Sequence, residues 1–467
     1  MPYSFALPTT SILNLADYLK SDSHPSLILA AATQRSIVRS VLKNHKRLAP
    51  QLRTQNLASV LAAIDEYIPY LLALDSGLSG KPVNDEEIDV VLQKEIEVEW
   101  RSPLATSLGT VPARVSGRGL EYEMAFVLHT RACIAGLQAR MTLQALELSG
   151  DDRKETITKA AISAKDCLLY AESVHRHLST RGTEGQFPPA AVDISPSTQS
   201  ALSNLCCAEA TLMVILSQDP YPAAVLQSRD KDDREWMYKA RDIPKVRASL
   251  CGRLAIRAAE YAEKALSLLG PKIQKSFVEY VQNIRAMSKA KACRFLAIDA
   301  ELGGKVGEAI AWLIAGKKHL GYKINETNDG KASSLSKLKL EWKQRREEKK
   351  AAKGGEMVLE SNKSDEVRAL ELLEQEFNKT NDMINHQLVP SSDTIWAAMP
   401  SGRDVIQPQT INLSLLDQET IARLRAPLDQ AELARVRREI NEDSDTEEQT
   451  EVPGSFPDSQ EQSSSYY

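Results

Sequence analysis

The sequence is poor in aromatic residues and has no excess of positive charge. Phe, Trp and Tyr together make up 5% of its 467 residues, whereas β-sandwiches depend on aromatic and β-branched side chains. The formal net charge is −5 at pH 7, although nucleic-acid binding requires a basic surface. No apolar run approaches the roughly 18 residues that cross a membrane. These absences disfavour a β-sandwich, a nucleic-acid-binding protein and direct transmembrane insertion.

The six cysteines form no pattern that binds a metal or links a secreted fold. No CxxC pair occurs, so the sequence indicates neither a zinc site nor a disulfide framework. The N-terminal residues lack the basic stretch and apolar core of a signal peptide. We therefore expect a cytoplasmic protein with no metal and no cofactor.

No arrangement of residues predicts an active site. In the segment 77–81, Gly-Leu-Ser-Gly-Lys, the next residue is Pro82 where a phosphate-binding loop has Ser or Thr, so a turn is favoured. His175 and His177 are two positions apart and would face different sides of a helix. His129 falls in an apolar helix, where we expect a hydrogen-bonded core residue. We predict a protein that is not an enzyme.

Apolar residues recur at three- and four-residue steps along much of the chain, as in amphipathic helices. Such stripes cover residues 58–74, 246–269 and 364–379. A helix over 287–302 ends at Gly303-Gly304 and another begins at once, which predicts an antiparallel helix pair of the type stacked in solenoids. Residues 95–100 alternate polar and apolar side chains, as strands do. We expect an all-α fold, an irregular curved helical solenoid with a small β element near residues 95–100.

The C-terminal part of the chain differs in composition from the rest. Residues 337–350 interleave Lys and Arg with Glu, which is typical of a solvated helix face. Residues 441–467 contain eight acidic residues and no Lys or Arg, so we expect them to be disordered. We divide the chain into a helical domain at 1–410, a C-terminal helical extension at 411–440 and an acidic tail at 441–467.

Five short segments, taken in order, are similar to motifs of one protein family. They are Glu95–Trp100, Tyr122–His129, Asp193–Leu205, Gly307–Ala311 and Asn381–Pro390. Together they resemble the Bro domain, the banana-shaped helical module of Alix and its relatives, over roughly residues 3–410. The segments 67–91 and 235–248 further resemble the branch of this family that regulates the fungal response to ambient pH.

The resemblance implies an apolar surface patch that binds an amphipathic helix. Bro domains bind the C-terminal helix of the core ESCRT-III filament subunit in this way. Aligned motif to motif, the patch positions are Leu250, Leu254, Val214 and Ile406. Leu250 and Leu254 are one helical turn apart and so would share one face. The same stripe continues along the helix, however, so a core position for this pair is the alternative.

The resemblance also implies a non-catalytic adaptor. Such a protein would bind the ESCRT-III subunit at the plasma-membrane cortex or at endosomes, beneath a pH-sensing membrane complex. It would support the proteolytic activation of a PacC-type transcription factor at alkaline pH. The alternative is a general endosomal, multivesicular-body sorting adaptor of the Alix type. A hydrolase with an unrecognised site is a third possibility, which a deep pocket with converging titratable groups would indicate.

Overall fold

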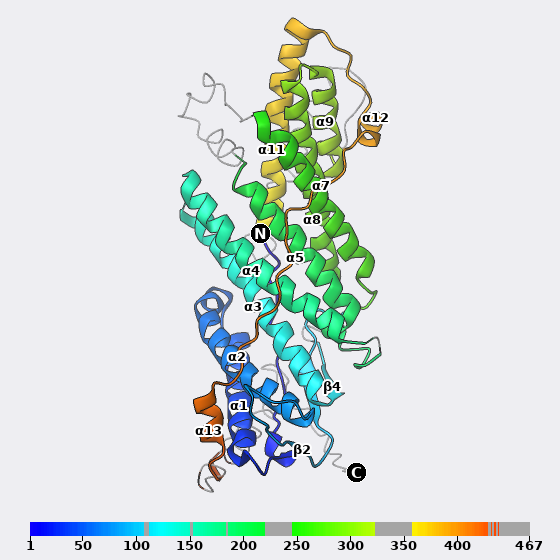
Figure 1. Ribbon diagram of the computed structural model, residues 1–467. Helices are drawn as coiled ribbons and strands as arrows, with labels where there is room; N and C mark the ends of the chain where they lie inside the picture. The colour runs from blue at the N-terminus through cyan, green and yellow to red at the C-terminus, as the bar shows by residue number, and fades with distance from the viewer. Residues whose placement is uncertain are drawn as a thin grey trace, which may run out of the picture.

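The computed structural model describes residues 1–106, 112–149, 153–183, 185–219, 245–322 and 357–427, together with residues 431, 434, 435 and 438. Within these ranges the chain is mostly helical and has two small antiparallel sheets. Figure 1 shows an elongated molecule in which long helices lie side by side. The predicted helical fold with a small β element is confirmed.

The N-terminal end of the molecule combines two long helices with both sheets. Its elements are η1 (Leu15–Asp17), β1 (Leu19–Lys20), α1 (Pro25–Arg47), α2 (Pro50–Leu78), β2 (Val91–Leu92), β3 (Glu97–Arg101) and β4 (Arg114–Arg118). Each of the two helices begins at a proline, whose fixed φ suits the first helical turn. Strand β1 pairs with β2 and strand β3 with β4, both antiparallel. The strand predicted over 95–100 corresponds to β3.

The rest of the molecule is a series of helices that pack on their neighbours in the chain. They are α3 (Leu120–Ser149), α4 (Lys154–Arg181), η2 (Val192–Ile194), α5 (Pro196–Leu216), α7 (Lys245–Leu268), α8 (Lys275–Leu302), α9 (Val306–His319) and α11 (Met357–Thr380). The predicted pair of helices around Gly303-Gly304 is present as α8 and α9. Gly304 has a positive φ of 74°, which favours glycine at this turn.

After α11 the chain turns and runs back along the molecule. It passes through the π-helix η4 (Asn381–Asn385) and α12 (Ser392–Ala397) and then reaches α13 (Gln418–Leu424). Residues 398–417 between α12 and α13 form no helix or strand, and we call this segment the strap. Figure 1 shows the strap passing the middle helices on its way to α13, which lies beside α1.

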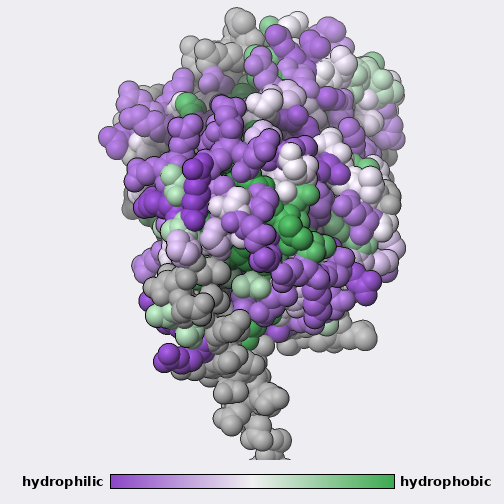
Figure 2. Space-filling model, turned by 60° about the horizontal axis from the view of Figure 1, so that its bottom comes forward, coloured by the Kyte–Doolittle hydropathy of each residue, from purple (hydrophilic) through white to green (hydrophobic). Residues whose placement is uncertain are grey.

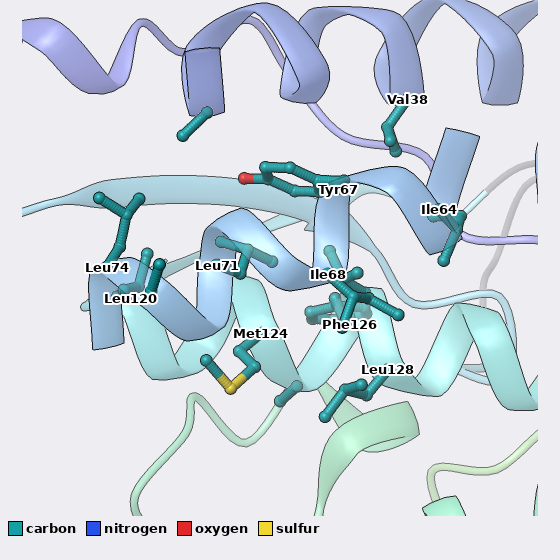
Figure 3. Packing of buried hydrophobic residues seen from close by; sticks show 14 of the residues in the cluster. Val38, Ile64, Tyr67, Ile68, Leu71, Leu74, Leu120, Met124, Phe126 and Leu128 are labelled. Carbon is teal, nitrogen blue, oxygen red and sulfur yellow. The ribbon is translucent and has the colours of Figure 1, made fainter. Parts of the chain in front are cut away.

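The largest hydrophobic core joins α1, α2 and α3 to the β3–β4 sheet. Figure 3 shows Ile68 of α2 near Phe126 of α3, with Tyr67 turned toward α1. A buried polar group lies inside this core. Glu123 accepts hydrogen bonds from Arg35 Nε at 2.9 Å and from Trp100 Nε1 at 2.6 Å. This group ties three elements together, because each of its partners comes from a different one.

Two described helices, α2 and α5, are long and apolar enough to cross a membrane by length and composition alone. In α5 most of the apolar window is buried inside the protein, and in α2 half of it is. Both helices contribute residues to the hydrophobic cores, which accounts for their apolar composition.

Some expectations fall on parts of the chain outside the described residues. These are the charged helix at 337–350 and the acidic tail at 441–467. Within the expected extension at 411–440, α13 is described together with residues 411–417, and Leu416, Ile421 and Leu424 are buried in the core of α1 to α3. The predicted domain division itself stays a prediction.

Candidate partner-binding surface

The expected patch residues Val214 and Leu250 lie on two helices that pack against each other. Helix α5 begins at Pro196 with Ser195 as its N-cap, whose hydroxyl oxygen accepts a hydrogen bond from the Thr198 amide. Val214 is in the last turn of α5 and is partly buried against the core that α7, α8, α9 and α11 share. Leu250 is near the start of α7, and 38% of its side chain is exposed. Both are therefore accessible at the surface.

Leu254 is not on this surface, and the expectation that it would be exposed beside Leu250 is wrong. Only 3% of Leu254 is accessible, and it belongs to the same core as Cys251 and Ala255. Two residues four apart on a helix differ by only about 40° in direction. Because α7 packs against both α5 and α8, a wide side of this helix is buried. The boundary between its buried and its exposed side falls between Leu250 and Leu254.

Ile406 is also buried rather than open to a partner. It lies in the strap with 9% of its surface accessible. Its side chain belongs to a hydrophobic cluster lined by α3, α4 and α5, whose members include Leu168, Cys207 and Met213. The expectation that Ile406 would form part of an exposed patch is therefore wrong, because its side chain packs against α3, α4 and α5 and is covered by them.

Polar contacts fasten the strap to one face of α7. Arg253 Nε donates to the Ser401 carbonyl at 3.0 Å, and the Arg403 amide donates to the Arg253 carbonyl at 3.0 Å. The Tyr261 hydroxyl donates to Asp404 at 2.6 Å. Burial alone would raise the pKa of Asp404, but this hydrogen bond and others lower it, so the carboxylate is charged. The strap thus covers the side of α7 that carries Arg253 and Tyr261, beginning one turn after Leu250.

The strap was not predicted from the sequence, although the polar residues of α7 give a signal for its position. Arg253, Arg257 and Tyr261 recur at four-residue steps, so they form a polar row beside the apolar stripe of α7. Such a row is compatible with plain solvent exposure as well as with a docked segment. Only the tertiary structure shows that Asp404 contacts two members of the row.

The histidines considered as candidates for chemistry are packed in the core or half-buried beside it. His129 and His175 are both buried with their ring centroids 5.7 Å apart, and the amide group of Gln199 contacts the two rings at 3.0 Å and 2.7 Å. Burial, reinforced by His129, lowers the pKa of His175 to about 3, so this ring is neutral. Within the part of the chain that the structure describes, no group of three His, Cys, Asp or Glu residues could hold a metal ion.

Two hollows in the part of the chain that the structure describes were considered as candidate active sites. One, between α3 and the end of α4, has a volume of about 20 Å³ and is lined by apolar residues such as Met124 and Phe187. That volume is close to the space of a single water molecule. The other is an open, polar hollow of about 600 Å³ beside α13.

Comparisons with known proteins agree with this fold. The model of the BRO1-like domain family matches residues 39–428. The chain is 41% identical to the pH-response regulator protein palC of Emericella nidulans, with 98% of each chain covered. It is 24% identical to palC of Yarrowia lipolytica, with 87% of this chain and 93% of the relative covered. Neither name indicates an enzymatic activity.

A solved structure of ALIX in complex with the SIVmac239 PYKEVTEDL late domain has the same fold. The TM-score is 0.54 at 16% sequence identity, and the alignment covers 94% of this chain and 53% of the ALIX chain. The 41% identity to the Emericella relative and the family match over residues 39–428 together identify the family of this chain. The chain belongs to the BRO1-like domain family and, within it, to the palC group of pH-response regulators.

Proposed function

We propose that this protein is a non-catalytic adaptor that binds the C-terminal helix of the core ESCRT-III filament subunit and thereby supports alkaline-pH signalling. Recruitment to the plasma-membrane cortex or to endosomes would bring it beneath the pH-sensing complex. There it would help a protease to activate a PacC-type transcription factor. The identity to palC supports the pathway, and the exposed Leu250 supports the mode of binding.

The observation on which the binding proposal rests is the exposure of Leu250 at the edge of a well-packed core. Val214 packs against the core shared by α7 and α8, and Leu250 directly precedes Cys251 of that core; neither Val214 nor Leu250 is fully buried. An amphipathic partner helix would cover them with aliphatic side chains at three- or four-residue spacing. We propose Val214 and Leu250 as contacts. Leu254 belongs to the buried core against which Val214 packs, and Ile406 belongs to a different cluster.

The expected affinity of one partner helix is low. Burial of an aliphatic side chain contributes about 1.5–3 kcal/mol, whereas association costs on the order of 4–15 kcal/mol. Two such side chains alone therefore do not hold a monomeric helix tightly. A filament that repeats the helix many times raises the apparent affinity through avidity. This suits an adaptor that is recruited only where the filament has assembled.

The test is binding of the isolated C-terminal peptide of the ESCRT-III core subunit, measured by fluorescence anisotropy. We expect Leu250→Asp to weaken binding at least about tenfold without changing the circular dichroism spectrum. Leu52→Asp, at another exposed leucine, is the matched control and should bind like the wild type. Equal binding by the wild type and Leu250→Asp would exclude this surface.

The pathway assignment has its own test, which separates it from general sorting in the manner of Alix. In a deletion strain, we expect loss of alkaline processing of the transcription factor and normal vacuolar delivery of a ubiquitinated cargo. The opposite pattern, with failed delivery and an intact alkaline response, would favour the sorting adaptor.

A further inference from the structure

The small β1–β2 sheet exposes two neighbouring apolar side chains at the end of the molecule. Val91 is 56% accessible and Leu92 is 45% accessible, and together they make up β2. Successive residues of a strand point to opposite faces of its sheet. Exposure of both therefore means that neither face of this sheet is covered at β2. Figure 2, which brings this end forward, shows hydrophobic side chains gathered among hydrophilic ones.

The chain on either side of these two residues is strongly acidic. Residues 84–99 contain seven carboxylates and one lysine. Among the residues that the structure describes, Asp85, Glu87 and Glu95 are exposed and have no side-chain partner. We call Val91, Leu92 and these three carboxylates the acidic end surface.

Three cations near this surface already have partners of their own. Lys20, whose backbone pairs with that of Val91, forms a 2.7 Å ion pair with Asp22. Lys94 lies over the ring of Tyr18, 5.3 Å from its centre. Arg425 of the segment after α13 pairs with Glu86. The surface therefore keeps an excess of negative charge.

The acidic end surface is held in place by the strap and by a tight turn. Asn84 and Asp85 both have positive φ, at 47° and 66°, as a two-residue hairpin turn requires. Asn84 Nδ2 donates to the carbonyl of Leu416 in the strap at 2.6 Å. The open hollow of about 600 Å³ lies here, with Asp85 and Glu87 in its lining. Arg425, which pairs with Glu86, lines the same hollow, so the hollow already accommodates one cationic side chain.

We propose that the acidic end surface docks a basic peptide segment of another protein, with an aliphatic residue of that segment placed on Val91 and Leu92. Its carboxylates would repel nucleic acid and anionic lipid. They would also repel the chain's own residues 441–467, which contain eight acidic residues and no cation. A partner with lysine or arginine around one or two leucines has the complementary charge and the complementary apolar contact.

The proposal is tested with the full-length protein and a fluorescein-labelled, lysine-rich synthetic peptide that contains two leucines one helical turn apart. We expect saturable binding that weakens as salt is added, because exposed charges are screened. Val91→Ser with Leu92→Ser, and separately Glu87→Lys with Glu95→Lys, should each weaken binding at least about tenfold. Ile162→Ser and Glu155→Lys on α4 are the matched controls and should bind like the wild type.

Three results would overturn the proposal. They are the absence of saturable binding, equal binding by the wild type and both double variants, and equal binding of a peptide whose leucines are replaced by serines. This surface is separate from the α5–α7 surface. Leu250→Asp should therefore leave binding of the basic peptide unchanged, whatever the outcome for the ESCRT-III peptide.

Discussion

Asp404 in the strap accepts a 2.6 Å hydrogen bond from the hydroxyl of Tyr261 on α7, although the two residues are 143 positions apart. Arg257 Nη2 donates to the same carboxylate at 3.1 Å. The next residue but one, Ile406, is buried among α3, α4 and α5. The strap is thus held by the polar contacts of Asp404 and, two residues later, by the apolar packing of Ile406. We call the contacts of Asp404 the Asp404 anchor.

Loss of the Asp404 anchor should loosen the strap without unfolding the protein. We expect Asp404→Ala to lower the free energy of unfolding by about 1–3 kcal/mol, because charged hydrogen bonds are lost. Limited proteolysis should cleave the strap faster in this variant. Asp393→Ala, at an exposed position in α12, is the control and should be cleaved at the wild-type rate. Unchanged cleavage of Asp404→Ala would mean that the anchor does not hold the strap.

The two leucines of α7 should respond differently to truncation. Leu254→Ala removes a buried side chain and should cost about 2–5 kcal/mol in urea unfolding. Leu250→Ala removes a partly exposed side chain and should cost less than about 1 kcal/mol. Similar losses for both variants would contradict the placement of the core edge between these residues.

Removal of the Glu123 carboxylate should strongly destabilise the N-terminal core. Glu123→Ala leaves the Arg35 guanidinium buried without its counter-charge, which we expect to cost about 3–5 kcal/mol. Chemical denaturation of the variant measures this loss. Glu66→Ala, at an exposed position on α2, should change stability by less than about 0.5 kcal/mol. A loss below 1 kcal/mol for Glu123→Ala would show that the network contributes little.

His175 should make the protein less stable as the pH falls. Its pKa is about 3 in the folded state and is near 6.5 in an unfolded chain, so below pH 6.5 the unfolded state binds a proton that the folded state does not. Stability then falls by up to about 1.4 kcal/mol per pH unit between those two values. We expect His175→Asn to reduce this slope in urea titrations from pH 7 to pH 4. An unchanged slope would assign the acid sensitivity to other groups.

Gly307 at the start of α9 should not tolerate a side chain. A Cβ atom there would collide with the carbonyl oxygen of Leu388, because Gln387 draws that loop against the helix through hydrogen bonds to Gly304 and Gly307. Gly307→Ala should cost about 1–3 kcal/mol in thermal or chemical unfolding. Gly303→Ala, where the nearest backbone atoms are at ordinary contact distance, is the milder comparison. Equal stability of the two variants would contradict the close approach.

Much of the fold could be predicted because helix periodicity is a local property. The apolar stripes of α2, α7 and α11 and the Gly303-Gly304 turn are visible as short-range patterns, and each corresponds to an element of the structure. The alternation in β3 is equally local, with Val98 and Trp100 buried and Glu97 and Glu99 exposed.

The candidate site was harder to predict because exposure depends on which helices surround a residue. Leu250 and Leu254 look alike in the sequence, yet one lies at the surface and the other inside the core. The difference arises because α5 and α8 pack on α7 from two sides.

By itself, the sequence determined the helical character of the chain, the positions of several of its helices and its family, since these follow from spacing and from short motifs. The tertiary structure alone decided which apolar residues remain open to a partner. It buried Ile406 of the strap against α3, α4 and α5 and left Val91 and Leu92 exposed at the N-terminal end of the molecule. The physical reason is that burial is settled by contacts between separate elements, such as α7 with α5 and α8, or the strap with α3, α4 and α5, and no local pattern records such contacts.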